Sequence, residues 1–353
     1  MSMVFTRAAA IAFASSAALA VVLASSLAVA DGTDSDGDGV SDGLEDATQR
    51  TVAASAAGDE FSVSSHLGTA ALEDQFDLSY HAGTFEVAYS RTDGIGSSYE
   101  LNLLNLIAWK DGNGNGRIDN GEIVRTTALG SAAFGNAPVL ASNWTDTDGG
   151  RVFEFLVQSR DGNATLNITV AQRFERIDTI VLTPMEARLD IRIKPAVVPP
   201  GANLGLEFRM DTHERVLLED HSWDEVQGFA PNEKEINVTA SGRGHSSTVF
   251  FSWSNTVLAD GSGIPVALLG GPFEPGPYNL TLNYAFGSST PSNTILQHAT
   301  LGVRSALFDI RRATEPSSGP QGDFVLYAAT LAGVTAFVAV TIVLANRRTS
   351  RKP

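Results

Sequence analysis

From about residue 60 to residue 311, apolar residues recur at every second position in short runs, a pattern typical of β-strands with one buried face. One run covers 153–157 and the next covers 166–170, and the turn sequence Asp161-Gly162 between them predicts a β-hairpin. The same alternation predicts strands at Phe76–Tyr80, Phe85–Tyr89, Leu189–Ile193, Leu204–Phe208, Ile236–Val238, Phe250–Trp253 and Tyr278–Tyr284.

These runs predict an all-β fold, a large β-sandwich ectodomain over 59–312. Clusters of Pro and Gly at Val198–Gly201 and Gly270–Pro277 separate the runs. Two sub-sandwiches divided near 180–200 are the alternative. One continuous domain is favoured because 179–195 lacks the composition of a linker.

The N-terminal segment 1–30 has the layout of a secretory signal peptide. Arg7 supplies the positive charge, 8–27 form an apolar stretch rich in small residues, and Ala28-Val29-Ala30 matches a cleavage site. The apolar stretch is long for a signal peptide, so an uncleaved N-terminal anchor is the alternative.

At the other end, 324–345 are 22 residues without a charge. A helix of this length crosses the hydrocarbon core of a bilayer, about 30 Å. Because basic residues flanking a span stay cytoplasmic, the basic tail 346–353 predicts a single-pass type I protein of the cell membrane with an extracellular ectodomain. The segment 313–323 has the composition of a flexible stalk.

The stretch DGNGNGRIDNGE, residues 111–122, carries the most specific chemistry. Calcium prefers six to eight oxygen ligands, among them a bidentate carboxylate at loop position 12, with glycine at position 6 for a sharp turn. Gly116 stands at position 6, and Ile118 at position 8 is placed to anchor the loop to a core. The loop resembles the EF-hand calcium loop, which implies that these residues are the ligands, Arg117 through its backbone carbonyl: Asp111, Asn113, Asn115, Arg117, Asp119 and Glu122.

The residues that follow the loop, 123–127, are β-branched and lack helical spacing, although Tyr99–Trp109 would also suit an entering helix. The sequence therefore predicts a calcium loop between two strands.

A second loop of the same design follows the signal segment, within an acidic segment and linker at 31–58. Its sequence, DSDGDGVSDGLE, is similar to the thrombospondin type 3 calcium repeats of extracellular proteins. The alternative is a solvated acidic linker. The resemblance implies these ligands: Asp34, Asp36, Asp38, Val40 through its carbonyl, Asp42 and Glu45.

Charge and composition narrow the function further. All 40 acidic residues but only 19 of the 24 basic residues lie in 31–323, a net charge of −21 that disfavours nucleic acid as a partner. The chain has no cysteine, which excludes thiol catalysis and disulfides. No P-loop or H-E-x-x-H motif occurs. Five N-x-S/T sequons are candidate glycosylation sites, at Asn143, Asn163, Asn167, Asn237 and Asn279. Asn167, Asn237 and Asn279 each stand between two apolar residues of an alternating run, which predicts that they face outward.

Together these features predict a non-catalytic, calcium-binding, membrane-anchored glycoprotein of a prokaryotic envelope, archaeal or bacterial. Its role is structural or adhesive, with the membrane and a cell-surface protein or polysaccharide as partners. The alternative is a carbohydrate-active or carbohydrate-binding sandwich, in which tryptophans such as Trp144, Trp223 and Trp253 form a sugar platform. Tryptophans buried as ordinary core would count against that alternative.

Overall fold

A computed structural model describes Asp42 and residues 50–68, 73–92, 94–134, 139–145, 150–177, 180–220, 233–242, 245–260, 262–271, 273–286 and 291–304. All of these residues fall in one compact unit. The predicted signal peptide, stalk, span and tail lie outside them, as does the loop 34–45 apart from Asp42. No helix among the described residues is long and apolar enough to cross a membrane.

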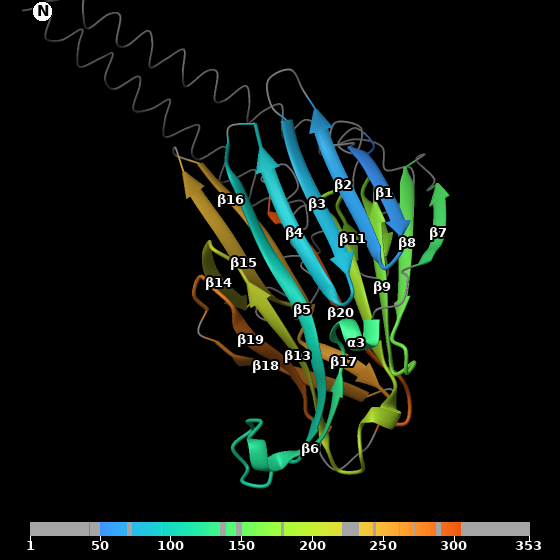
Figure 1. Cartoon of the computed structure of the whole chain (residues 1–353), viewed down its shortest axis with the longest axis vertical. Coiled ribbons are helices and arrows are strands. Elements are labelled where there is room, and N and C mark those ends of the chain that lie inside the picture. The colour runs from blue at the N-terminus through green and yellow to red at the C-terminus, as the bar shows by residue number, and fades with distance from the viewer. Residues whose placement is uncertain are drawn as a thin grey trace, which may run out of the picture. The chain divides into compact units, whose positions relative to one another are not determined.

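The described chain is all-β, as predicted, and consists mainly of two antiparallel sheets (Figure 1). The predicted strand runs all lie within observed strands. The first sheet has this order: β1 (Thr51–Ala57), β2 (Glu60–Gly68), β3 (Glu73–His81), β4 (Thr84–Arg91), β5 (Gly96–Trp109), β13 (Asn203–Asp211), β19 (Tyr278–Tyr284) and β18 (Ser262–Gly270).

The second sheet contains a comparable set of strands. Its order is β7 (Val139–Thr145), β8 (Arg151–Gln158), β9 (Ala164–Ala171), β12 (Glu186–Ile193), β20 (Ile295–Arg304), β16 (His245–Ser254), β15 (Glu233–Gly242) and β14 (Arg215–Asp220). The strand β17 (Thr256–Ala259) pairs with both β18 and β20, so this hairpin joins the two sheets. The region 180–200 includes β12, which lies between β9 and β20 within the sheet.

Shorter elements complete the described chain. A small hairpin consists of β10 (Glu175–Ile177) and β11 (Ile180–Leu182). Helical structure with defined bounds is limited, in the described part, to the short segments α3 (Gly130–Phe134), η2 (Asn120–Glu122) and η3 (Pro195–Val197).

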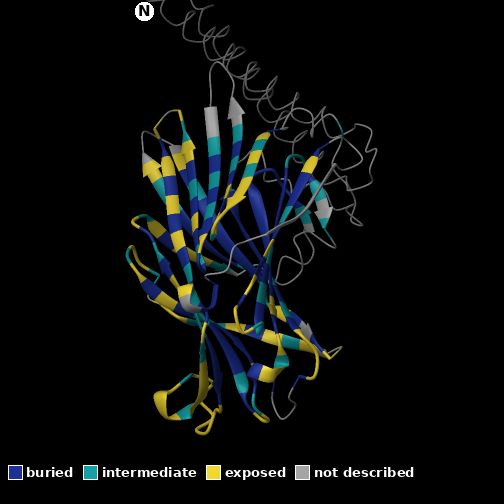
Figure 2. Ribbon diagram, turned by 45° about the vertical axis from the view of Figure 1, so that its right-hand side comes forward, coloured by how far each residue is buried: buried dark blue, intermediate teal, exposed yellow. Residues whose placement is uncertain are grey.

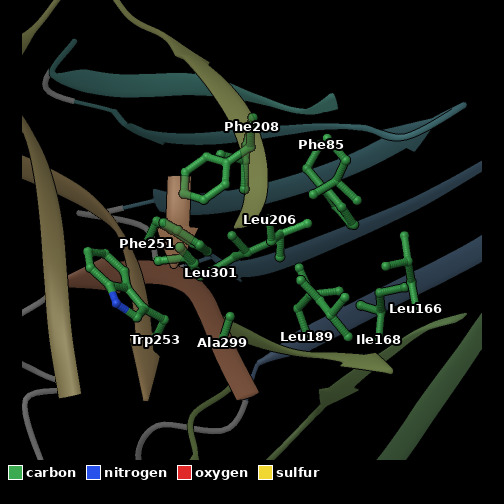
Figure 3. Close-up of a cluster of buried hydrophobic side chains, with 14 of the residues drawn as sticks. Phe85, Leu166, Ile168, Leu189, Leu206, Phe208, Phe251, Trp253, Ala299 and Leu301 are labelled. Atoms are coloured by element: carbon green, nitrogen blue, oxygen red, sulfur yellow. The ribbon is translucent and has the colours of Figure 1, made fainter. Parts of the chain in front are cut away.

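The core lies between the two sheets. Along strands such as β4, buried inward positions alternate with exposed or half-buried outward positions (Figure 2). Phe61 of β2 stacks on Phe155 of β8 with ring centroids 4.7 Å apart, and Phe208 of β13 meets Phe251 of β16 edge to face at 5.3 Å. Figure 3 shows Phe208 and Leu206 from the first sheet facing Phe251, Leu301 and Leu189 from the second. This aromatic and aliphatic layer supplies the main stabilisation of a fold without disulfides.

Candidate calcium loop and neighbouring polar sites

The loop 111–122 connects β5 to β6 (Ile123–Ala128), as the sequence predicts (Figure 1). The strand β5 is 14 residues long: its first half pairs with β4 and its second half pairs with β6. The N–H of Lys110 donates to the carbonyl of Glu122 at 2.9 Å, which closes the base of the loop. The loop therefore extends from the end of a strand that is central to the first sheet.

The Asp111 carboxylate organises the first half of the loop. Its Oδ1 accepts hydrogen bonds from the N–H groups of Gly114 and Asn115 at 2.7 and 3.1 Å. Its Oδ2 accepts one from Gly116 at 3.0 Å. Gly116 has φ of +69°, the left-handed conformation that favours glycine and that the sharp turn at position 6 requires. These bonds fold the chain around the position 1 carboxylate.

The other two acidic side chains accept hydrogen bonds from the first half of the loop. Asp119 Oδ2 accepts hydrogen bonds from the side-chain amides of Asn113 and Asn115, at 2.9 and 3.0 Å. Glu122 Oε1 accepts hydrogen bonds from the N–H groups of Gly112 and Asn113, at 2.8 and 3.2 Å. Hydrogen bonds thus connect the side chains at positions 3, 5 and 9 directly, whereas those at positions 1 and 12 bind backbone N–H groups of the loop. The carboxylates of Asp111, Asp119 and Glu122 are not all within 4.8 Å of one another.

One oxygen of this loop has no partner. Glu122 Oε2 is buried and makes no hydrogen bond, although Oε1, the other oxygen of the same carboxylate, accepts two. A buried carboxylate oxygen without a partner is costly, because it has lost its water without compensation. Position 12 of an EF-hand loop is the residue that supplies both carboxylate oxygens to calcium. The residue types of the loop and the free oxygen of Glu122 thus fit a calcium ion, which Asp111, Asn113, Asn115, Asp119, Glu122 and the carbonyl of Arg117 would hold.

Ile118 connects the loop to the first sheet. A Cβ placed on Gly205 of β13 would lie 3.0 Å from Ile118 Cδ1 and 2.8 Å from Thr281 Cγ2 of β19. Gly205 therefore leaves the space that the Ile118 side chain enters, on the outer face of the sheet. The neighbouring Trp109 is buried on the same face and donates from Nε1 to Asn283 Oδ1 at 2.9 Å. The loop anchor expected from the sequence is present, and it lies on the outer face rather than in the main core.

Replacing Ile118 by alanine is expected to lower the free energy of unfolding by about 1–2 kcal/mol, since a half-buried isoleucine loses part of the 2–5 kcal/mol of a buried one. Calcium affinity should fall several-fold, because the loop is no longer fixed to β13. Chemical denaturation and calcium titration measure the two effects. Ile123→Ala is the matched control, because this isoleucine follows the loop directly but is 36% exposed. Equal effects of the two substitutions would contradict the anchoring role.

A buried polar cluster that the sequence analysis missed lies on β12 and β20. Asp190 Oδ1 accepts a hydrogen bond from Arg188 Nε at 2.8 Å and lies 2.7 Å from His298 Nδ1. Arg188 is 3% exposed, and its Nη1 donates to the carbonyl of Ile177 in the β10–β11 hairpin at 2.9 Å. Burial raises the pKa of the Asp190 carboxyl, but hydrogen bonds from His298 and Arg188 outweigh burial and hold that pKa below its usual value. The cluster attaches the small hairpin to the second sheet.

The sequons differ in accessibility. Asn279 on β19 is exposed, Asn163 and Asn167 are half-buried, and Asn143 lies on β7. Asn167 donates to Glu154 Oε1 at 2.5 Å. The expectation that alternation places Asn237 outward at the surface is wrong, because Asn237 is only 7% exposed. The outer face of β15 and β16 is itself buried there, including Glu235, Asn237, Phe250 and Ser252.

Support for a sugar platform is weak in the described part. Trp253 is fully buried against Phe251, as expected for core, and the exposed large hydrophobic side chains among the described residues are all aliphatic. Trp223 lies outside the described residues. A depression of about 500 Å³ on the outer face of β1–β4 has no aromatic side chain in its lining, which consists of Ala53, Ala54, Ser55, Ser62, Val63, Ser64, Asp77, Leu78, Ser79, Glu86 and Ala88.

Comparison of the chain with protein-family models finds no match, and comparison with curated protein sequences finds none either. The residues themselves therefore carry the functional argument.

Proposed function

We propose that this chain is a calcium-binding surface protein, anchored in the cell membrane with its β-sheet domain outside, and that its role is structural or adhesive. The unpartnered buried oxygen of Glu122 carries the calcium proposal, because the loop places it where a bidentate ligand is needed. The anchor and the extracellular location rest on the apolar segment 324–345 and the basic tail after it.

Calcium supplies a divalent positive charge to a loop whose carboxylates otherwise repel one another. Asp111, Asp119 and Glu122 stand at positions 1, 9 and 12 of the loop. Each already accepts hydrogen bonds from backbone or side-chain amide groups of the loop. When these carboxylates are held together, Ile118 is held against Gly205 as well. Binding in the loop would thus stabilise the contact between β5, β13 and β19. Stabilisation by bound calcium would be useful to an extracellular domain without cysteine, because no disulfide constrains its unfolded chain.

Calorimetric titration of the full-length chain with calcium chloride tests the proposal. The wild type is expected to bind two equivalents, one at 111–122 and one at 34–45. The double variant Asp111→Asn/Glu122→Gln keeps side-chain size and should bind one equivalent fewer. Glu86→Gln/Glu100→Gln is the matched control, because it removes two exposed carboxylates that face each other on β4 and β5. Unchanged stoichiometry and affinity in the loop variant would refute calcium binding at 111–122.

A further inference from the structure

Three side chains of metal-binding type converge at one end of the first sheet, away from the sequence motifs. Asp59 lies in the turn between β1 and β2, Glu60 begins β2, and His81 ends β3. One ligand atom from each lies within 4.8 Å of the other two. None of the three belongs to a recognisable sequence motif, because 20 residues of intervening chain separate Glu60 from His81.

Strand pairing fixes this arrangement. Glu60 and His81 are directly opposite each other in the β2–β3 ladder, so their side chains leave the sheet on the same face. The tight turn at Gly58, where φ is +65°, brings Asp59 beside them. Ligands that project from paired strands are held more rigidly than ligands on a long loop.

The distances match shared ligation of an ion better than direct hydrogen bonding. His81 Nδ1 lies 3.3 Å from Glu60 Oε1 and 3.7 Å from Asp59 Oδ2. Both separations exceed the usual N–H···O length of about 2.9 Å. Two ligands bound tetrahedrally to one zinc ion at about 2.0–2.2 Å lie about 3.4 Å apart, between the two observed values. A small closure of the turn would bring all three atoms to one ion.

The geometry points to a site for a divalent transition-metal ion, of which Zn²⁺ is the representative, formed by Asp59, Glu60 and His81. Imidazole nitrogen with carboxylate oxygen suits zinc, whereas calcium prefers oxygen ligands alone. The site is therefore chemically distinct from the loop 111–122. The three side chains are 49%, 68% and 57% exposed, so water completes the coordination and the ion exchanges with solvent. Bound zinc would join the β1–β2 turn to the end of β3.

Titration of the full-length chain with zinc chloride, in buffer containing millimolar calcium, tests this site. We expect one zinc equivalent in the wild type that His81→Ala removes, and an affinity at least tenfold weaker in Glu60→Gln. His213→Ala is the matched control, because His213 is also exposed and precedes a glutamate in a turn. It should bind zinc like the wild type.

Three results would overturn the proposal. The first is absence of zinc binding by the wild type, and the second is His81→Ala binding zinc with unchanged stoichiometry and affinity. The third is zinc binding that occurs in calcium-free buffer and is abolished by millimolar calcium, which would show that the carboxylates act as an unselective acidic patch. The calcium titrations described above report on different residues, so failure at one site leaves the result at the other unaffected.

Discussion

Removal of calcium is expected to lower the melting temperature of the full-length chain by about 4–7 °C. A ligand present at twenty times its dissociation constant stabilises the folded state by about 1.8 kcal/mol. For a domain of this size, each kcal/mol shifts the melting temperature by about 2–4 °C. Extracellular loops of this type bind calcium with dissociation constants of about 10⁻⁴–10⁻³ M, so calcium at about 2–20 mM, twenty times those values, and an excess of chelator are the two conditions to compare.

The variant Asp111→Ala/Glu122→Ala assigns this effect to one loop. In calcium it should melt near the temperature of the metal-free wild type, and chelator should change it less than it changes the wild type. The carboxylates of Glu86 and Glu100 again provide the control pair, as Glu86→Ala/Glu100→Ala. A loop variant that keeps the full calcium-dependent shift would mean that 111–122 has no structural role.

Replacing Asp190 by alanine is expected to lower the free energy of unfolding by about 3 kcal/mol, because removal of one partner of a buried ion pair takes a counter-charge away from the other. Arg188 is 3% exposed and also contacts His298 and the carbonyl of Ile177. Urea denaturation at neutral pH measures this loss. The β10–β11 hairpin should also exchange its amide hydrogens faster, since Arg188 connects it to the sheet.

The chain contains a closely matched control. Arg209 and Asp211 on β13 repeat the same residue types at the same spacing, but their side chains are 47% and 37% exposed and their charged atoms are 4.0 Å apart. Exposed pairs contribute at most about 1 kcal/mol. Asp211→Ala should therefore change stability by much less than Asp190→Ala. Similar losses at the two positions would show that burial does not determine the effect.

The pH dependence of Asp190 follows from the direction of its pKa shift. Its pKa is lower in the folded than in the unfolded state, so the carboxylate stabilises the fold fully above the ordinary aspartate pKa of about 3.9. That stabilisation is lost as the pH falls through the lower, folded pKa. The stability advantage of the wild type over Asp190→Asn should therefore be constant near neutral pH and decrease below about pH 4.

The strands, and the place of residues 111–122 between two of them, were predictable because both depend on local sequence. Alternation at 153–157 and 166–170 identified β8 and β9, since side chains of a strand point to opposite faces in turn. The β-branched residues after Glu122 identified a strand rather than the second helix of an EF-hand. In each case the relevant residues lie within one segment of the chain.

What the sequence did not predict depends on how distant segments pair. Asn237 has the alternation expected of a surface position, yet the outer face of its strand is covered, so it is buried. The convergence of Asp190 with His298 requires β12 to pair with β20, more than 100 residues later. Periodicity within a strand identifies its two faces but not the segments that cover them.

The position of β20 in the second sheet has a mechanical consequence. This strand is the last described one, and it is flanked on both sides, by eight residue pairs with β12 and six with β16. A force that pulls on the chain beyond Arg304 is applied first to this strand. Because β20 lies between two antiparallel ladders rather than at an edge, pulling along its axis would have to break many of its hydrogen bonds together. The domain would therefore resist tension transmitted through the C-terminal part of the chain.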